Sequence, residues 1–132
     1  MRSLRILIII TLAAGGLFIN WNSTDATGSL TVGLASWYSE ESPGINRTTA
    51  NMEIFDDTAM TCAMWDIPFG TMLEVRNLEN GRSVVVRVND RGPARRFHRR
   101  GRVIDLTREA FRRIAHPDKG LVTVTVRVID PA

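Results

Sequence analysis

Short runs of alternating apolar and polar residues dominate the chain after residue 29. Residues 30–38 alternate in this way and end in two aromatic residues, which is typical of a half-buried strand. Residues 72–77 and 83–88 form two more runs, and the Asn80-Gly81 pair between them is a strong hairpin signal. Residues 121–129 alternate Val with Thr or Arg and predict a closing strand. The pattern therefore predicts a domain made mostly of strands.

Three segments depart from this alternation. Residues 58–65 are apolar and favour a short helix, whereas the Arg-rich segment 94–102 predicts a loop. Thr107 precedes a segment with apolar residues on one helical face, so we expect Thr107 to cap a helix over about 107–115. The pair His116-Pro117 then ends that helix.

These elements fit one small, mainly β domain. The 132 residues suffice for a single domain with a hydrophobic core, and the sequence contains no internal repeat. Short strands with one clear helix indicate a closed barrel, because closure removes exposed sheet edges. We expect the domain to span residues 32–130, after a linker at 27–31.

The N-terminal 26 residues have the pattern of an export signal. Arg2 and Arg5 precede an almost unbroken apolar run at 6–19, which is shorter than a membrane-spanning helix needs. Residues 24–26 offer a cleavage site, and an uncleaved N-terminal anchor is the alternative. No cysteine follows the apolar run, so we expect an exported protein of the periplasm or cell envelope that is not a lipoprotein.

Positive charge is concentrated in one part of the chain. Sixteen of the seventeen basic residues are arginines, and ten of these lie between Arg87 and Arg113. Such a surface suits a polyanion, although a merely solubilising surface is the alternative. Export argues against nucleic acid and favours anionic polymers of the envelope. The loop residues expected to meet them are Arg95, Arg96, Arg99 and Arg100.

Cysteine and histidine usage argues against a disulfide, a metal site or a cofactor. Cys62 is the single cysteine and lies in an apolar context, so we interpret it as a small buried residue. His98 and His116 are far apart, without the spacing of metal ligands. We therefore expect no metal and no cofactor. We also expect a monomeric protein.

Acidic residues at turns are the first candidates for chemistry. Asp90 follows the apolar run 84–88, between Asn89 and Arg91, and the Gly92-Pro93 turn then stops the strand, so a rigid strand end presents a polar side chain. Glu53 and Asp56 are three residues apart, which places them on one side of a turn. By themselves, these residues fit turn capping at least as well as an acid–base pair or a cation site.

Six blocks of residues in one order change that balance. They include Gly-Leu-Ala-Ser-Trp-Tyr at 33–38, Pro-Phe-Gly-Thr at 68–71 and Val-Asn-Asp-Arg-Gly-Pro at 88–93, together with 49–56, 77–84 and 103–107. In these blocks the chain resembles the rare lipoprotein A (RlpA) family of septal-ring lytic transglycosylases. The resemblance implies a six-stranded double-psi β-barrel, the fold of expansins, and endolytic cleavage of peptidoglycan glycan strands with 1,6-anhydro products.

The resemblance also implies roles for individual residues. The acidic positions of the family fall on Glu53, Asp56 and Asp90, with Asp90 as the acid. The residues expected to flank this site and bind substrate are Tyr38, Thr49, Met64 and Arg91. Met64 stands where the family usually has His, and a thioether neither titrates nor donates a hydrogen bond. An expansin-like module that binds wall glycans without cutting them is the alternative function.

The chemistry sets one geometric expectation. A transglycosylase acid must be protonated before reaction, so the pKa of Asp90 should be raised by burial or by a neighbouring carboxylate, for which Glu53 and Asp56 are the candidates. A guanidinium beside Asp90 would have the opposite effect. We therefore predict that Arg91 points away from Asp90, towards the glycan or another carboxylate.

Overall fold

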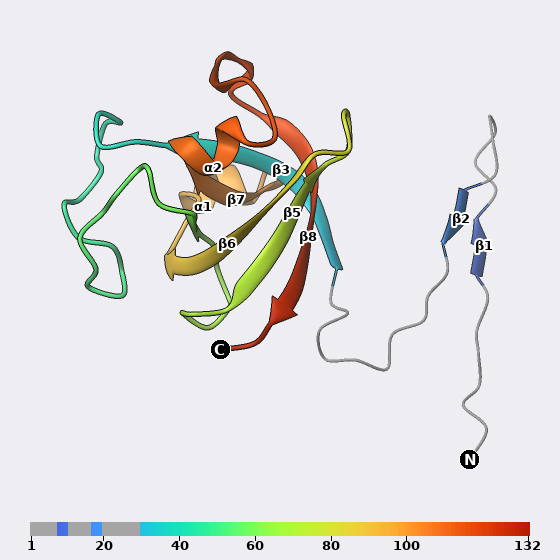
Figure 1. Ribbon diagram of the computed structural model, residues 1–132, viewed down its shortest axis with the longest axis horizontal. Coiled ribbons are helices and arrows are strands. Elements are labelled where there is room, and N and C mark those ends of the chain that lie inside the picture. Colours follow the sequence, from blue (N-terminus) through green and yellow to red (C-terminus); the bar gives the residue numbers. More distant parts are fainter. Residues whose placement is uncertain (1–7, 11–16, 20–29) are drawn as a thin grey trace.

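Six strands close into one barrel in the computed structural model, which describes residues 8–10, 17–19 and 30–132 (Figure 1). The strand order around the barrel is β3-β7-β4-β6-β5-β8. The strands are β3 (Leu30–Tyr38), β4 (Thr61–Ala63), β5 (Met72–Asn77), β6 (Ser83–Asp90), β7 (Arg102–Thr107) and β8 (Val122–Asp130). The helical elements are α1 (Arg95–His98), α2 (Arg108–Arg112) and the 3-10 helix η2 (Pro117–Lys119).

Two short strands lie in the predicted signal segment. These strands, β1 (Ile8–Ile10) and β2 (Leu17–Ile19), pair antiparallel. The rest of the segment 1–26, including its cleavage site, lies outside the described residues, so the export signal stays a prediction. None of the helices in the described ranges is long and apolar enough to cross a membrane.

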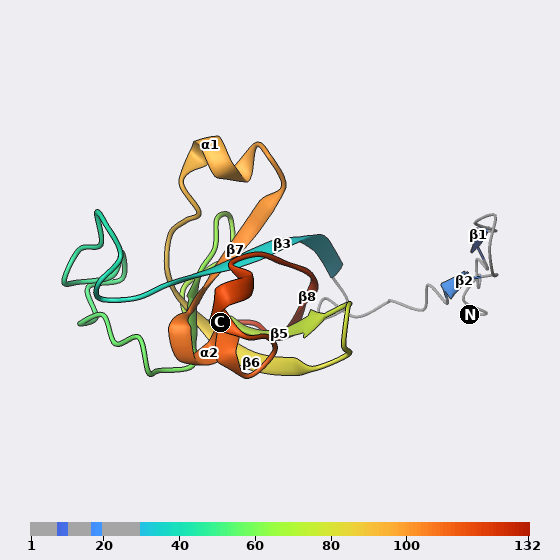
Figure 2. The same ribbon diagram turned by 90° about the horizontal axis from the view of Figure 1, so that it is seen from above.

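Two parallel strand pairs give the barrel its crossovers. β3 pairs with β7 in parallel and β4 pairs with β6 in parallel, whereas the remaining neighbours are antiparallel. The strands of a parallel pair are not consecutive here: β4, β5 and β6 intervene between β3 and β7, and β5 intervenes between β4 and β6. Residues 39–60 connect β3 to β4, and residues 91–101 connect β6 to β7 and contain α1, which Figure 2 shows beside β7. These two connections carry most of the polar residues discussed below.

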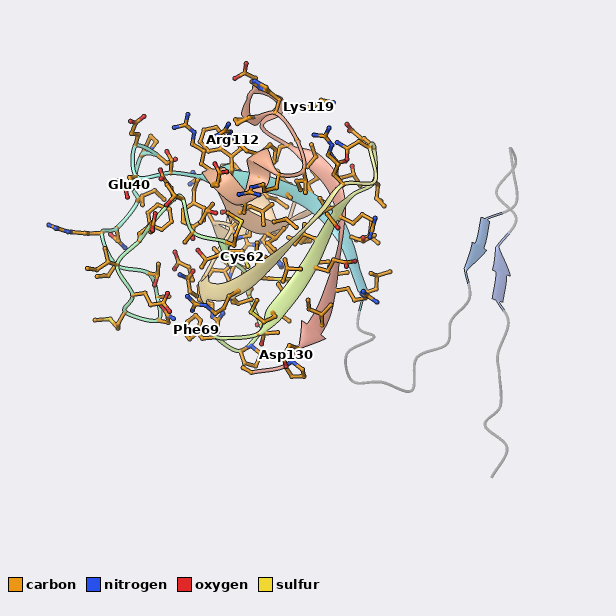
Figure 3. The ribbon with its side chains drawn as sticks, in the orientation of Figure 1. Glu40, Cys62, Phe69, Arg112, Lys119 and Asp130 are labelled. Atoms are coloured by element: carbon orange, nitrogen blue, oxygen red, sulfur yellow. The ribbon has the colours of Figure 1, made fainter. Side chains whose placement is uncertain are left out.

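The core fills the barrel and continues under α2. Alternate residues of β5, β6 and β8 point inward. Cys62 lies buried and free near the centre (Figure 3), which confirms its interpretation as a small buried residue. Phe111 is fully buried, and burying such a side chain stabilises a fold by about 1.5–3 kcal/mol. The amide of Asn77 donates to the Ile114 carbonyl at 2.8 Å, which ties the turn after α2 to β5.

The local predictions were largely right in type, with three corrections. The predicted hairpin is formed by β5 and β6, and Gly81 has the positive φ of 75° that its turn requires. The predicted helix 107–115 is shorter, at 108–112, although Thr107 caps it as expected by accepting from the Ala110 N–H. Segment 94–102 contains α1 and was wrongly predicted to be entirely loop.

Residues 58–65 were predicted to favour a short helix, and this was wrong. Thr61–Ala63 form β4, which fills the gap between β6 and β7. All three residues are buried, and their backbone groups pair with strands far away in sequence. A short apolar run does not by itself distinguish helix from strand, and the barrel decides it here.

Candidate catalytic groove

A β-bulge at the end of β6 sets the direction of Asp90. Cys62 pairs with Val88, but the next residue of β4, Ala63, pairs with Asp90, so Asn89 is an extra residue on β6. Bulges of this kind redirect side chains at the rims of barrels. Val88 faces the core, whereas Asp90 lies beside Ala63 on the outer face.

Asp90 belongs to a row of side chains across four strands. Ser36 of β3 pairs with Asp105 of β7, Asp105 pairs with Ala63 of β4, and Ala63 pairs with Asp90 of β6. Residues opposite each other in a sheet share a face. Two strand spacings separate the aspartates, so their Cα atoms are about 10 Å apart. The small side chain of Ala63 lies between two carboxyl groups.

Two hollows meet at Asp90. One, of about 420 Å³, is lined by Asp105, Arg102, Tyr38 and Gly92 among others, and the second, of about 440 Å³, is lined by the segment 48–50 and Met52. Asp90 and Arg91 line both hollows. We call the two hollows together the groove. The residues that connect β3 to β4 form one of its walls.

The contacts of Asp90 leave one carboxyl oxygen with a single partner. Its Oδ1 accepts the backbone N–H groups of Ala50 and Arg91, both at 2.9 Å. Its Oδ2 receives the Tyr38 hydroxyl at 3.4 Å. Tyr38 is buried and stacks on Phe55 at 4.6 Å; burial, followed by the charges of Asp90 and Asp105, raises the pKa of its phenol. The phenol therefore stays protonated and orients Oδ2.

Asp105 was not among the predicted site residues. Its Oδ1 accepts from the Ser36 hydroxyl and from Arg102 Nε, the latter at 2.9 Å. Its Oδ2 lies near Gly92, where a Cβ would approach it to 3.5 Å at a φ of 154°. A glycine therefore keeps this side of the groove open. The sequence signal was an aspartate inside the apolar run 103–106, which gives no indication of its neighbours.

Glu53 anchors the segment 48–54 to β6. Its carboxylate accepts hydrogen bonds from both terminal nitrogens of Arg87, at 2.6 and 3.0 Å, and from the side-chain amide of Asn89 at 3.0 Å. Hydrogen bonds from Arg87, then Asn89 and Asn51, lower the pKa of Glu53 to about 2. No hydrogen bond joins Glu53 to Asp90. These contacts give Glu53 a positioning role, and the catalytic role implied for it stays a prediction.

Glu53→Gln should make stability less dependent on pH. The folded pKa lies near 2, below the ordinary 4.5, so the ion pair stabilises the fold above about pH 4.5 and loses that effect as pH falls towards 2. Because 38% of each side chain is exposed, solvent screens the pair, and we expect about 1 kcal/mol. Thermal melts should show the variant about 4 °C below the native protein at pH 7. An equal gap at pH 2.5 would contradict this account.

Asp56 makes the contacts of a turn-capping residue. Its Oδ1 accepts the N–H and hydroxyl of Thr58, at 2.9 and 2.6 Å, and these bonds lower its pKa. Oxygens of Glu40, Asp56 and Asp57 come within 4.8 Å of one another on the segment where Figure 3 labels Glu40. The cluster is largely exposed and no other feature indicates a cation there. The catalytic role implied for Asp56 stays a prediction.

Arg91 points away from Asp90, as expected. Its Nη1 donates to the Met64 carbonyl at 3.0 Å, and its guanidinium lies 3.8 Å from the Phe69 ring centre. No ion pair joins it to Asp90 among residues 30–132. Its partners are a carbonyl and a ring and not a second carboxylate, and the alternative expectation, a contact with the glycan, stays a prediction.

Besides Tyr38, two more of the predicted substrate-binding side chains are buried, those of Thr49 and Met64. Met64 packs into the main core, and only its backbone serves the site, by donating from N to the Asp90 carbonyl at 3.1 Å. Thr49 is 3% exposed and donates to the Asn51 side chain at 2.5 Å. In this structure both residues shape the groove without presenting a side chain to it, because the barrel and the folded-over loop enclose them.

A protein-family model described as "Lytic transglycolase" matches residues 30–126. A relative from Synechocystis sp., named probable endolytic peptidoglycan transglycosylase RlpA, is 42% identical over 125 residues, which are 92% of this chain and 37% of that protein. Relatives with the same RlpA name occur in Pseudomonas aeruginosa and Yersinia pestis, at 43% and 51% identity. The chain thus spans well under half the length of the curated relatives it matches.

Solved structures with the same fold have diverse functions. The Streptomyces papain inhibitor superposes with a TM-score of 0.59 at 25% identity, covering 77% of this chain and 96% of that one. A mutant expansin of Clavibacter michiganensis in complex with cellohexaose gives a TM-score of 0.55 at 27% identity, covering 79% of this chain and 52% of that one. The fold alone therefore does not identify the function, which must be inferred from the residues of the groove.

Proposed function

Because this chain belongs to the RlpA-like lytic transglycolase family, we propose that it cleaves glycan strands of peptidoglycan endolytically. The bond broken is the β-1,4 link between N-acetylmuramic acid and N-acetylglucosamine, and the product carries a 1,6-anhydro end. The observation that supports this best is the row Asp90–Ala63–Asp105 in the groove. Two carboxyl groups flank a small residue where a sugar ring has room.

Asp90 acts first as the acid and then as the base. Its Oδ2 gives a proton to the bridging oxygen as the bond to C1 breaks. The resulting carboxylate takes the proton of the C6 hydroxyl, whose oxygen bonds to C1 and closes the 1,6-anhydro ring. The carboxyl regains a proton in place of the one that it gave and returns to its starting state, and no water is consumed. The two backbone N–H groups on Oδ1 hold the carboxyl in one orientation throughout.

Asp105 supplies a fixed negative charge. Positive charge develops on the sugar ring as the glycosidic bond breaks. Arg102 and Ser36 both bind Oδ1, whereas Oδ2 lies near Gly92 at the groove and has no hydrogen-bond partner among residues 30–132. An oriented charge of this kind stabilises a transition state without reorganising during the reaction.

Digestion of purified glycan strands, followed by mass spectrometry, tests the function. Anhydro ends are the expected product. Reducing ends in their place would mean hydrolysis by an ordered water and would refute transglycosylation. Intact strands that still bind would favour the second candidate, a non-catalytic glycan-binding module. Its supporting observation is the similarity to the expansin whose structure holds cellohexaose.

Export to the cell envelope is part of the proposal. Peptidoglycan lies outside the cytoplasm, and residues 1–26 have the composition of an export signal. We propose a periplasmic or envelope protein that is not lipidated and acts as a monomer. Fractionation of cells that express the full chain would show it with the cytoplasmic proteins if this were wrong.

The Arg-rich loop is proposed to bind anionic envelope polymers. Arg95 stacks on Trp65 at 3.8 Å and Arg96 on Phe97 at 4.6 Å, and neither has a carboxylate partner among residues 30–132. Arg99 and Arg100 are exposed at the end of α1. Reversing all four charges should weaken binding to isolated envelopes about tenfold at low salt, with less effect at high salt. Reversal of four exposed arginines elsewhere, at Arg82, Arg108, Arg112 and Arg113, is the matched control, and equal binding by both variants would refute the proposal.

A further inference from the structure

Met52 combines two properties that rarely occur together. It is 79% exposed, more than any other large apolar residue in the described ranges, and its φ is 73°. A side chain with a Cβ is disfavoured at positive φ, where glycine is the usual choice. Solvent exposure of an apolar side chain also gains nothing for folding. Neither the exposure nor the positive φ of Met52 stabilises the fold. A contact with a ligand outside the folded chain therefore explains a methionine at this position better.

The segment around Met52 is fixed to the barrel. Its own N–H donates to the Thr49 carbonyl at 2.9 Å, and the Asn51 N–H donates to the Asn89 carbonyl at 3.3 Å. Next to it, Glu53 is bound to Arg87. Met52 is therefore presented at one place on the rim of the groove, because residues on both sides of it are tied to β6.

The surroundings of Met52 identify the kind of group it meets. It lines the hollow that contains Asp90 and Arg91, whose other walls are mostly backbone and polar side chains. Such walls suit the hydroxyl groups of a sugar. A flexible thioether instead suits a small apolar substituent. On an amino sugar, that substituent is the methyl of the acetamido group, which glucose lacks.

We propose that Met52 binds the acetamido methyl group of an amino sugar adjacent to the sugar whose glycosidic bond is cleaved. This contact makes the groove selective for N-acetylated strands. This inference rests on the proposed function, since it names a contact within the same groove. Burial of one methyl group corresponds to about a fivefold gain in affinity.

Two neutral oligosaccharides test the contact. N-acetylglucosamine hexamer and cellohexaose differ only at C2, by acetamido against hydroxyl. Calorimetry should show that the native chain binds the N-acetylated hexamer about fivefold more tightly. Met52→Ala and Met52→Gly should remove this preference and leave the affinity for cellohexaose unchanged. Val85→Ala is the matched control, because Val85 is also apolar and 43% exposed but lies on the β6 surface.

Thermal melts separate the contact from folding. Met52→Gly relieves the positive φ, so its melting temperature should equal or exceed that of the native chain. A loss of selectivity without a loss of stability supports the inference. Preference for the N-acetylated hexamer in both Met52 variants would overturn it and leave the proposed function intact. Failure of the native chain to bind either hexamer would overturn the inference and the binding of glycans by this groove. The proposed transglycosylase activity is tested separately, by the digestion of glycan strands.

Discussion

Asp90→Asn lowers the rate of strand cleavage by about 10³-fold, the loss expected when a general acid is removed. Asparagine is nearly isosteric, and its side-chain carbonyl still accepts the N–H groups of Ala50 and Arg91. The segment 48–54 therefore keeps its position, and only the transferable proton is lost. Mass spectrometry of the anhydro products over time gives the rate.

Two controls belong to the Asp90 experiment. The melting temperature and strand affinity of Asp90→Asn should stay close to those of the native chain. Asp118→Asn, an exposed aspartate in η2 away from the groove, should cleave at the native rate. A cleavage rate for Asp90→Asn within tenfold of the native rate would exclude Asp90 as the acid.

Asp105→Asn should reduce cleavage by about 10²-fold, mainly in kcat. The amide oxygen still accepts from Ser36 and Arg102, so the substitution removes the charge with little change in shape. The sugar ring is neutral in the ground state and gains positive charge only as the bond breaks. The missing charge therefore weakens the transition state more than substrate binding.

Kinetics over a range of strand concentrations measure this effect. A rise in KM with unchanged kcat would show that Asp105 only binds substrate. An unchanged rate would leave Asp90 as the only carboxyl of the row with a part in the reaction. Asparagine has nearly the same size as aspartate, so either outcome can be interpreted. A larger change would disturb β7, because Asp105 is half-buried within this strand.

The bulge in β6 links the fold to this chemistry. Without the bulge, regular alternation through Asn89 would place Asp90 on the same face as Val88, towards the core. With it, Asn89 binds Glu53 and Asp90 faces the groove. The same barrel serves an expansin and a papain inhibitor, so differences in such local features must separate the functions.

Much of the fold was determined by the sequence alone. Alternation located β3, β5, β6 and β8, Asn80-Gly81 located the hairpin, and Thr107 located the start of α2. The strand end at Asp90 was also located, whereas its role as the acid came from the family resemblance and stays a proposal. All of these signals act between residues close together in the chain, through turn conformation, capping and side-chain period.

The tertiary structure decided the rest. The register between strands distant in sequence makes β4 a strand, aligns Asp105 with Asp90 across Ala63, and encloses Met64 in the core. The pairing of Glu53 with Arg87 arises in the same way, from residues 34 positions apart. Local patterns do not specify register, because it results from packing all six strands around one core, and the partners in the groove follow from that packing.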